Sequence, residues 1–432
     1  MKSVFTVAAL SALALGAVLC SCSSEVAGDD VTNIVILSDV HVMAPELLVQ
    51  EGSAFDAYLA KDRKMLRESS DLSSLVTEEI LVQKPDYVII SGDLTKDGEL
   101  ISHLWLRQHC LDTLLAAGIQ PLVIPGNHDV LNANAVKFLG DSTSHVPNIS
   151  VEEYLEIYAP YGYDGAVARD SCSLSYVWQI SPDVRLLALD ACKYEFNDME
   201  KGITRTDGAI REGTLAFIKE QLADAKAQGM HVFATMHHGL NEHWTLQDEA
   251  TPGYVIDNRR QVRALLRRGG VKLVFTGHAH AQDITRRGGV YDVETGSLVS
   301  YPNSHREAVI RGGRMSVSTR LIEDVPFGFP GDDFQAYSRR CTSNGFRRIV
   351  RDMVGVELPD SLMEVVVTSG VEGLCAHYEG NEVMTPEVKK QVSETARAVS
   401  EYSKKWGLIY KRLLHSLWSD PNSDDYSLVL DL

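Results

Sequence analysis

The sequence has little cysteine, fewer basic than acidic residues and no long apolar run after its first 20 residues, and each shortage narrows the class of protein. Only seven cysteines occur in 432 residues, with no CxxC pair, which argues against a cysteine-ligated zinc site. Lysine and arginine total 41 against 59 acidic residues, for a formal net charge of −18. We therefore expect no stable nucleic-acid binding, because that needs basic side chains to replace counterions.

The remaining composition is typical of a soluble globular protein, with 44% hydrophobic and 23% charged residues. A chain of 432 residues suffices for one large α/β domain with an appendage, or for two domains. Neither an internal repeat nor a low-complexity tract is visible in it.

The first residues have the pattern of a targeting segment. Lys2 precedes the apolar stretch VFTVAALSALALGAVL, and small residues follow it. The LCSC segment resembles a bacterial lipobox, which predicts a signal peptide at 1–21, lipidation of Cys22 after the small Ser21, and a linker at 22–30. A plain secretory signal and an anchor helix are the alternatives. We expect an exported protein that a lipid anchors to the membrane of the bacterial cell envelope, facing the periplasm or the surface.

Five cysteines follow that segment, and they are odd in number and far apart. In an exported protein one disulfide is expected, for which Cys172 and Cys192 are the candidate pair, or else buried free thiols.

Short apolar runs alternate with helical patterns between residues 31 and 322. This alternation predicts an α/β domain with a largely parallel sheet, followed by strands with tight glycine turns. The segment DVPFGFPGDD then marks a linker, and helical patterns follow at 334–354 and 385–417. We expect residues 323–432 to form a mostly helical extension that packs on the core, caps the site or joins two copies into a homo-oligomer.

Polar side chains stand where the predicted strands end. Asp39 and His41 follow the first strand, Asp93 the second, Asn127 and His128 the third, His237 a later one, and His278 and His280 the last of the alternating series. In a parallel α/β sheet the carboxyl ends of the strands are neighbours, so these side chains should meet at one edge.

Imidazole, carboxylate and amide donors together suit Zn, Fe or Mn and are too rich in nitrogen for calcium. Seven candidate ligands are too many for one tetrahedral zinc but suit two divalent ions that share a carboxylate, as in many phosphoesterases.

The motifs DVH, GDL, GNHD, MHH and GHAH, in this order, closely resemble those of the calcineurin-like metallophosphoesterase superfamily over about residues 32–304. The resemblance implies a four-layer α/β/β/α sandwich, here with a C-terminal helical appendage. It implies that one ion is held by Asp39, His41 and His280, a second by Asn127, His237 and His278, and both by Asp93. His237 rather than His238 is taken as the ligand.

The resemblance also implies a mechanism, in which a metal-bridging hydroxide attacks phosphorus in line and His128 serves the substrate or the leaving group. Many relatives carry an aspartate three residues after the bridging one. Here Lys96 stands at that position and Asp97 follows it, so the sequence leaves the partner of His128 open.

The stretch SGDLTKDG resembles the branch with bacterial cyclic-nucleotide and glycerophosphodiester phosphodiesterases, so we expect a small-molecule phosphodiester as substrate. The alternatives are a phosphomonoesterase, a nucleotide or sugar-nucleotide pyrophosphatase, and a non-catalytic lipoprotein that binds a phosphorylated ligand. His243 and Trp244 are further candidates for the substrate pocket. Other histidines, such as His103, His305 and His377, are expected on the surface or in helices.

Overall fold

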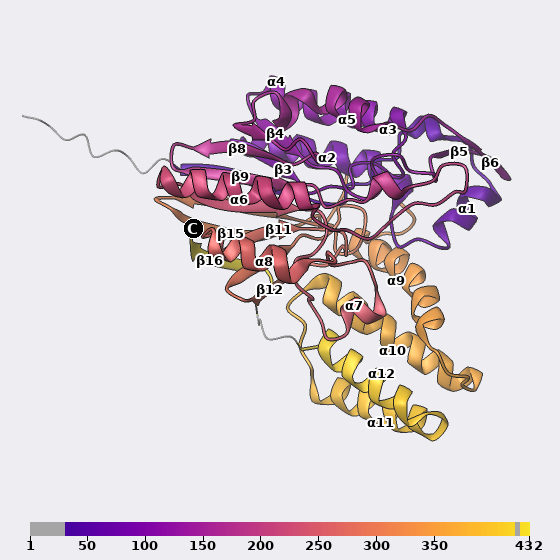
Figure 1. Ribbon diagram of the computed structural model, residues 1–432. Helices are drawn as coiled ribbons and strands as arrows, with labels where there is room; N and C mark the ends of the chain where they lie inside the picture. The colour runs from indigo at the N-terminus through magenta and orange to yellow at the C-terminus, as the bar shows by residue number, and fades with distance from the viewer. Residues whose placement is uncertain (1–30, 420–423) are drawn as a thin grey trace, which may run out of the picture. The chain divides into compact units, whose positions relative to one another are not determined.

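The computed structural model describes residues 31–419 and 424–432, and two large sheets form its centre (Figure 1). The first sheet has six strands in the order β16-β15-β14-β1-β3-β4, and the second has seven in the order β12-β13-β11-β10-β9-β8-β7. The predicted signal peptide, the linker and Cys22 lie outside the described residues.

In the first sheet, β1, β3 and β4 are parallel, and β14, β15 and β16 continue it antiparallel. Its strands are β1 (Val31–Leu37), β3 (Tyr87–Ile90), β4 (Gln120–Val123), β14 (Ser304–Arg311), β15 (Arg314–Leu321) and β16 (Ser427–Asp431). After the helical extension, the chain therefore returns to the first sheet and adds its last strand there.

In the second sheet, β9, β10, β11 and β13 are parallel, and antiparallel strands flank them. Its strands are β7 (Ala168–Arg169), β8 (Tyr176–Ser181), β9 (Val184–Leu189), β10 (His231–Met236), β11 (Leu273–Thr276), β12 (Asp283–Arg287) and β13 (Val290–Glu294). A separate small sheet contains β2 (Leu48–Gln50), β5 (Val136–Leu139) and β6 (Ser142–His145).

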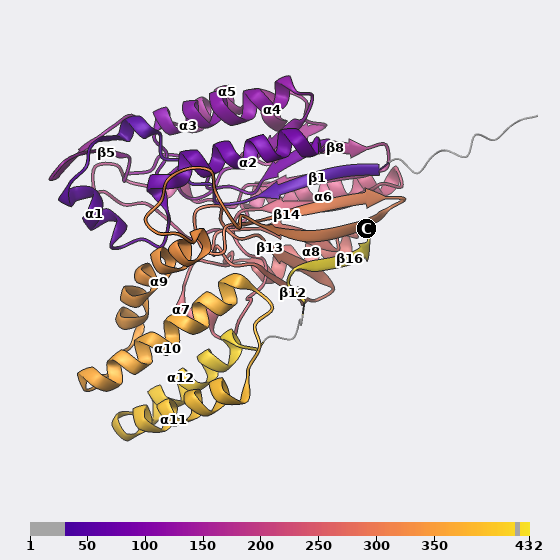
Figure 2. The ribbon, with the colours of Figure 1, turned by 180° about the vertical axis from the view of Figure 1, so that it is seen from behind.

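Buried residues of both large sheets share one core cluster, which includes Ile36, Val88 and Phe275. The helices α2 (Ser69–Gln83), α3 (Leu100–Leu106) and α4 (Asp112–Ala116) contribute to this cluster, whereas α6 (Glu212–Ala227) and α8 (Arg259–Arg268) pack in a second cluster. In Figure 1, α6 and α8 lie in front of the strands, and in Figure 2, from behind, α2 does. The predicted mixed α/β fold, with helices outside the sheets, is confirmed.

Shorter helices lie in the loops, namely α1 (Ser53–Leu59), α5 (Val151–Tyr158) and α7 (Gln247–Ala250). The extension contains α9 (Phe334–Met353), α10 (Asp360–Glu379), α11 (Pro386–Tyr402) and α12 (Lys404–Leu417), drawn orange to yellow in Figure 1. Within the described part of the chain, no helix has both the length and the apolar character that crossing a bilayer requires.

The helical pattern at 385–417 proves to be two helices, because Ser403 ends α11 and its hydroxyl caps α12 by accepting a hydrogen bond from the Trp406 amide. The sequence did not predict α10, because its run of β-branched residues and its glycines have low helix propensity. At Gly370 a Cβ would stand 2.7 Å from Val350, so this glycine allows α10 to approach α9 closely.

The disulfide expected between Cys172 and Cys192 was wrong, since both thiols are free. Cys192 is buried and its Sγ donates to the Pro125 carbonyl at 3.4 Å, whereas Cys172 is exposed. His305 was also misassigned, because it lies buried on β14 rather than on the surface or in a helix.

Candidate metal centre

The loops that follow β1, β3, β4, β10 and β11 meet at one end of the two sheets. Backbone hydrogen bonds hold them together: the Asp39 amide donates to the Gly92 carbonyl (3.1 Å), the His41 amide to Asp93 (3.0 Å), and the Gly277 amide to His237 (2.9 Å). The side chains that the sequence places at five separate strand ends are thereby brought into one cluster.

The backbone at this cluster is unusual. Asp39, His41, Asp93, His278 and His280 all adopt positive φ angles between 41° and 71°. Residues with a Cβ rarely adopt this left-handed region, and such conformations concentrate at functional sites where the surrounding structure maintains them. All five residues stand two to four positions after the end of β1, β3 or β11.

Two glycines leave room for the carboxylates. A Cβ at Gly126 would overlap the Asp93 side chain, and one at Gly277 would overlap Ser38 and Asp39. The GNHD and GHAH motifs therefore need glycine because the loops lie directly against the acidic side chains of their neighbours.

Asp39, His41 and His280 form the first group of donors. His280 Nε2 lies 3.2 Å from Asp39 Oδ1 and 3.2 Å from His41 Nε2. His41 Nε2 also lies 3.5 Å from Asp93 Oδ2, so Asp93 is next to this group. All four side chains are buried.

Asp93, Asn127, His237 and His278 form the second group. His237 Nε2 lies 3.3 Å from Asp93 Oδ2 and 3.2 Å from Asn127 Oδ1. Donor atoms of Asp93, His237 and His278 lie within 4.8 Å of one another. Asp93 Oδ2 thus lies next to both groups, 3.5 Å from His41 Nε2 and 3.3 Å from His237 Nε2.

The donor atoms have the properties that metal ions require. Asp39 Oδ1 and His278 Nε2 are buried and have no hydrogen-bond partner among the described residues. Burial, reinforced by Lys64, lowers the pKa of His41 to about 3, and burial with Arg63 lowers that of His280 to about 4, so both rings keep a lone pair at neutral pH. The residues present fit two divalent ions that share Asp93.

The orientation of the ring distinguishes His237 from His238. The Nδ1 of His237 is 2.9 Å from the Ser91 carbonyl and donates to it, which leaves Nε2 facing Asp93. His238 instead directs its Nε2 to the Thr206 carbonyl at 3.0 Å, away from the cluster. Only His237 is in a position to serve as a ligand.

His128 lies beside the cluster and is the most exposed member, with 22% of its side chain accessible. Its Nδ1 contacts Asp97 Oδ1 at 2.9 Å, and its Nε2 is 4.0 Å from Asp93 Oδ2. Burial disfavours the charged ring, but Asp93 and Asp97 outweigh it and raise the pKa of His128. Asp97 is therefore the partner that the sequence did not identify.

Lys96 contacts His128 through its main-chain carbonyl, which lies 2.6 Å from Nδ1. Its Nζ is fully buried and pairs with Asp97 at 2.6 Å and with Glu99 at 2.7 Å. The lysine thus holds in place the carboxylate that orients His128. The aspartate that contacts His128 therefore stands four residues after Asp93 instead of three. The motif alone does not reveal this difference.

The chain matches the calcineurin-like phosphoesterase family over residues 32–282. It belongs to this family. No curated protein matches the chain. Among solved structures, a dimetal phosphatase from Danio rerio is 16% identical, the match covering 67% of this chain and 96% of that one with a TM-score of 0.47. A protein named as a 5′-nucleotidase from Staphylococcus aureus is 14% identical, with 72% and 58% covered and a TM-score of 0.40.

This calcineurin-like phosphoesterase is a metal-dependent hydrolase of phosphate esters. Two basic residues lie near the site, since Arg63 adds to the effect of burial on the pKa of His280 and Lys64 to that on the pKa of His41, and Lys64 Nζ pairs with Asp62 at 3.3 Å. The sequence analysis missed both basic residues, since they lie in a loop without a motif.

The segment 294–303 contacts the phosphoesterase centre directly. Ser300 Oγ lies 2.9 Å from His280 Nδ1, and Ser297 Oγ donates to the Asp39 carbonyl at 2.7 Å. Of the two further candidates, Trp244 lines a cavity next to the centre, whereas His243 is buried in a different cluster.

Proposed function

We propose that this phosphoesterase hydrolyses a phosphodiester, with Asp39, His41 and His280 holding one divalent ion, Asn127, His237 and His278 a second, and Asp93 both. The observation that carries the proposal is the pair of adjacent donor groups that share Asp93, with His128 at their edge. When bound, two such ions supply positive charge and an activated water. Mn, Fe and Zn match the mixed nitrogen and oxygen donors.

The chain's own residues then serve the leaving group. His128 is the partly exposed imidazole beside the cluster. Asp97 and the Lys96 carbonyl hold its Nδ1 proton, and its Nε2 lies 4.0 Å from Asp93 Oδ2 at the edge of the donor groups. Its raised pKa favours the protonated ring, which donates a proton from Nε2 to the departing alkoxide. Arg63 and Lys64 add positive charge that favours a phosphate over a neutral ligand.

The resemblance of the SGDLTKDG segment to phosphodiesterases supports the preference for a diester. Lys96 and Asp97 of this segment form the ion pair behind His128. A monoesterase and a pyrophosphatase would use the same donors. A binding protein without catalysis would have no need of an oriented, partly exposed His128.

Hydrolysis of bis-p-nitrophenyl phosphate and p-nitrophenyl phosphate tests the proposal. The purified chain is treated with EDTA and assayed again after Mn, Fe or Zn is restored. We expect restored turnover, faster with the diester, and loss of about a hundredfold or more in His128→Ala and Asn127→Ala. Faster monoester turnover would replace the diester assignment, and a folded protein that binds two ions but hydrolyses neither compound would contradict catalysis.

We also propose that the protein is exported and anchored in the bacterial envelope through a lipid on Cys22. The lipobox-like LCSC segment supports this. Expression of the full chain in a bacterium with radiolabelled palmitate should label the wild type and not Cys22→Ser, and only the wild type should sediment with membranes. Equal labelling of both proteins would exclude Cys22.

A further inference from the structure

A second cluster of buried titratable side chains lies where the sheet meets the helical extension. Asp283 begins β12, Glu294 ends β13, His377 lies in the last turns of α10 and Glu382 follows that helix. His243, from the loop after β10, completes the cluster. None of these residues belongs to the centre described above.

The donor atoms converge without bonding to one another. His377 Nδ1 lies 3.4 Å from Asp283 Oδ2 and 3.5 Å from Glu382 Oε1. The three side chains are 3%, 1% and 2% exposed. Both ring nitrogens of His377, Oδ2 of Asp283 and Oε1 of Glu382 lack a hydrogen-bond partner within residues 31–419 and 424–432, whereas Asp283 Oδ1 lies 3.0 Å from His243 Nδ1.

These distances suit ligands of one ion better than hydrogen-bonded neighbours. Hydrogen-bonded pairs of this type lie about 2.7–3.2 Å apart. Donors that each stand about 2.0–2.2 Å from a common ion are instead separated by roughly 3.3–3.6 Å in a tetrahedral arrangement. The two measured separations fall in the second range.

The carboxylates of the cluster outnumber the histidines that face them, His243 and His377. Asp283, Glu294 and Glu382 are all buried, and a buried charge is costly unless it is paired. Arg306 is the fully buried basic residue next to them, but it donates to the main-chain carbonyls of Asp283 and Glu294 rather than to carboxylates. Asp292 already accepts hydrogen bonds from two backbone amides and a threonine.

We propose that Asp283, His377 and Glu382 bind a further divalent transition-metal ion. The mixed imidazole and carboxylate donors favour Zn, Mn or Fe. His243 adjoins the site, with Nδ1 3.0 Å from Asp283 Oδ1 and Nε2 3.2 Å from Glu294 Oε2. Asp283 follows the GHAH loop closely, and the Gln282 amide donates to the Tyr378 carbonyl at 3.1 Å, so this ion would fasten α10 to the loop that carries His278 and His280.

Metal analysis of the whole protein tests this site. After loading with Zn and dialysis, the wild type should hold one ion more per chain than His377→Asn or Glu382→Gln. Glu379→Gln is the matched control on α10, because Glu379 accepts from the Tyr301 hydroxyl outside the cluster, and it should retain the full number.

Anomalous diffraction from wild-type crystals at the zinc edge gives an independent reading that no variant can confound. A peak between Asp283, His377 and Glu382 is expected. No peak there, or equal zinc content in the wild type and the two variants, would show that protonated His243 and His377 balance the carboxylates and would overturn the proposal.

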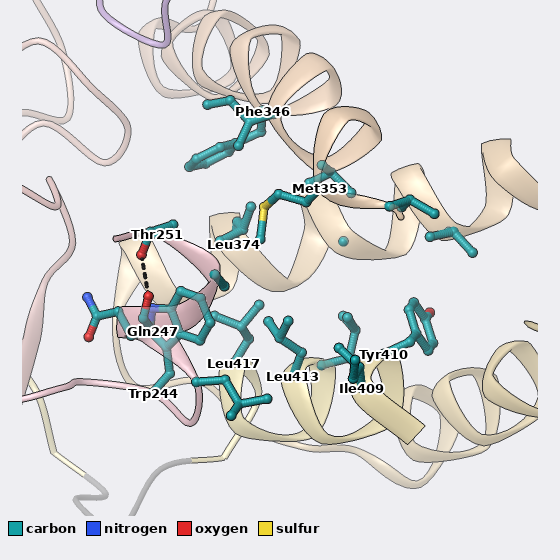
Figure 3. Close-up of a pocket in the computed structure, with 18 of the residues that line it drawn as sticks. Trp244, Gln247, Thr251, Phe346, Met353, Leu374, Ile409, Tyr410, Leu413 and Leu417 are labelled. Carbon is teal, nitrogen blue, oxygen red and sulfur yellow. Dashed lines mark hydrogen bonds between the residues drawn. The ribbon is translucent and has the colours of Figure 1, made fainter. Parts of the chain in front are cut away.

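A cavity of about 530 Å³ lies beside the metal centre that contains Asp93 (Figure 3). Side chains of α9, α10 and α12 line most of it, and Figure 3 shows Met353, Leu374, Ile409 and Leu413 pointing into it. The buried apolar residues of the extension form two clusters, one with Val350 and one with Tyr410, and both residues line the cavity. The helices thus leave an apolar space within the extension.

One wall of the cavity adjoins the metal centre. Ala279, which lines it, stands between His278 and His280. Tyr254, another lining residue, has its ring 4.6 Å from that of His278, and Arg63 donates to the hydroxyls of Tyr254 and Tyr378. Arg63 and the two tyrosine hydroxyls thus lie on the side of the cavity next to the centre, while the extension supplies mostly apolar residues together with His377 and Arg412.

We infer that the cavity receives an apolar alcohol group of the phosphate ester, such as an alkyl chain, while the phosphate lies at the metal centre. This inference rests on the proposed function. A pocket of a few hundred Å³ lined by apolar side chains buries an organic group of that size, and each buried methylene favours binding.

A series of p-nitrophenyl alkyl phosphodiesters, from methyl to octyl, tests the inference. In the wild type kcat/KM should rise at least about tenfold along the series. Leu413→Gln, in the cavity wall, should lose that rise, and Leu408→Gln, at an exposed position of the same helix, should keep it. The wild type and Leu408→Gln should hydrolyse bis-p-nitrophenyl phosphate equally.

Rates that do not depend on alkyl length would overturn the inference while leaving the proposed function intact. If no diester is hydrolysed, calorimetry with octyl phosphate and methyl phosphate still decides it. Tighter binding of octyl phosphate to the wild type than to Leu413→Gln is expected, and equal binding of both compounds would contradict it.

Discussion

At the residue scale, Asp97 is the clearest example of a residue whose role depends on its position in space and not on a sequence motif. Its contact with His128 Nδ1 favours the protonated ring, so Asp97→Asn should lower the pKa of His128. We expect kcat/KM to fall about tenfold to a hundredfold, and its alkaline limb to move to lower pH because the proton is lost earlier. A pH profile of diester hydrolysis measures both.

Glu99→Gln is the control for that variant. It removes the other ion pair of Lys96 without touching His128, so stability should fall while the pH profile stays in place. An unchanged profile in Asp97→Asn would mean that Asp97 does not act on His128.

The adjacent histidines allow a second test at this scale. His237→Ala removes a ring that faces Asp93 and Asn127, whereas His238→Ala removes one bonded to the Thr206 carbonyl. Metal analysis should find about one ion fewer in the first variant and no change in the second. Equal loss in both would contradict the assignment of His237.

The candidate ligands at the strand ends could be predicted from the sequence, because the apolar pattern locates the buried strands and the polar residues directly follow them. Polar side chains after buried parallel strands must meet at one edge, so Asp39, Asp93 and His278 were identifiable without coordinates. Arg63 and Ser300 could not be identified, since their approach to His280 depends on how distant loops fold over the centre.

At the element scale, the parallel strands could be predicted from apolar runs, but the helical extension could not be divided correctly. In α10 the run of β-branched residues opposes helix formation locally, and packing against α9 at Gly370 overrides that preference. Likewise the break at Ser403 interrupts a pattern that is amphipathic on both sides. Tertiary contacts decide such boundaries.

Ser403 gives a prediction for this scale. Its hydroxyl accepts from the Trp406 amide at the start of α12, so Ser403→Ala should destabilise the protein by about 1 kcal/mol. Urea unfolding measures this change. Ser393→Ala, on the exposed side of α11, serves as the control and should change the stability less. Equal effects would mean that the cap contributes nothing.

At the scale of the whole molecule, buried neutral histidines make stability depend on pH. In α3, His103 Nε2 donates to the Asp129 carbonyl and Nδ1 accepts from the Tyr158 hydroxyl, which requires the neutral ring. Burial lowers its pKa to about 3 from an ordinary value of 6.5. The stability due to this group is complete above pH 6.5 and is lost as the pH falls toward 3.

His103→Gln should therefore be less stable than the wild type at pH 7, and the difference should shrink on acidification. The expected change is about 1.4 kcal/mol per pH unit below 6.5. Urea unfolding at pH 7, 6 and 5 measures it. A difference that stays constant over this range would show that the folded protein accepts a proton on His103.

The return of the chain from α12 to β16 is a feature of the whole molecule that no local pattern predicts. β16 pairs with β15, and the Lys272 side chain donates to the Asp431 carbonyl. The short alternating segment at the end of the sequence has too few residues to indicate its partner, because pairing of strands distant in sequence depends on topology.

The central claim is that two divalent ions share Asp93 in this phosphoesterase. Anomalous diffraction from crystals soaked in Mn²⁺ tests it most directly. We predict two peaks about 3.5–4 Å apart, one beside Asp39, His41 and His280 and the other beside Asn127, His237 and His278, with Asp93 between them. A single peak, or two peaks that do not both contact Asp93, would contradict the account.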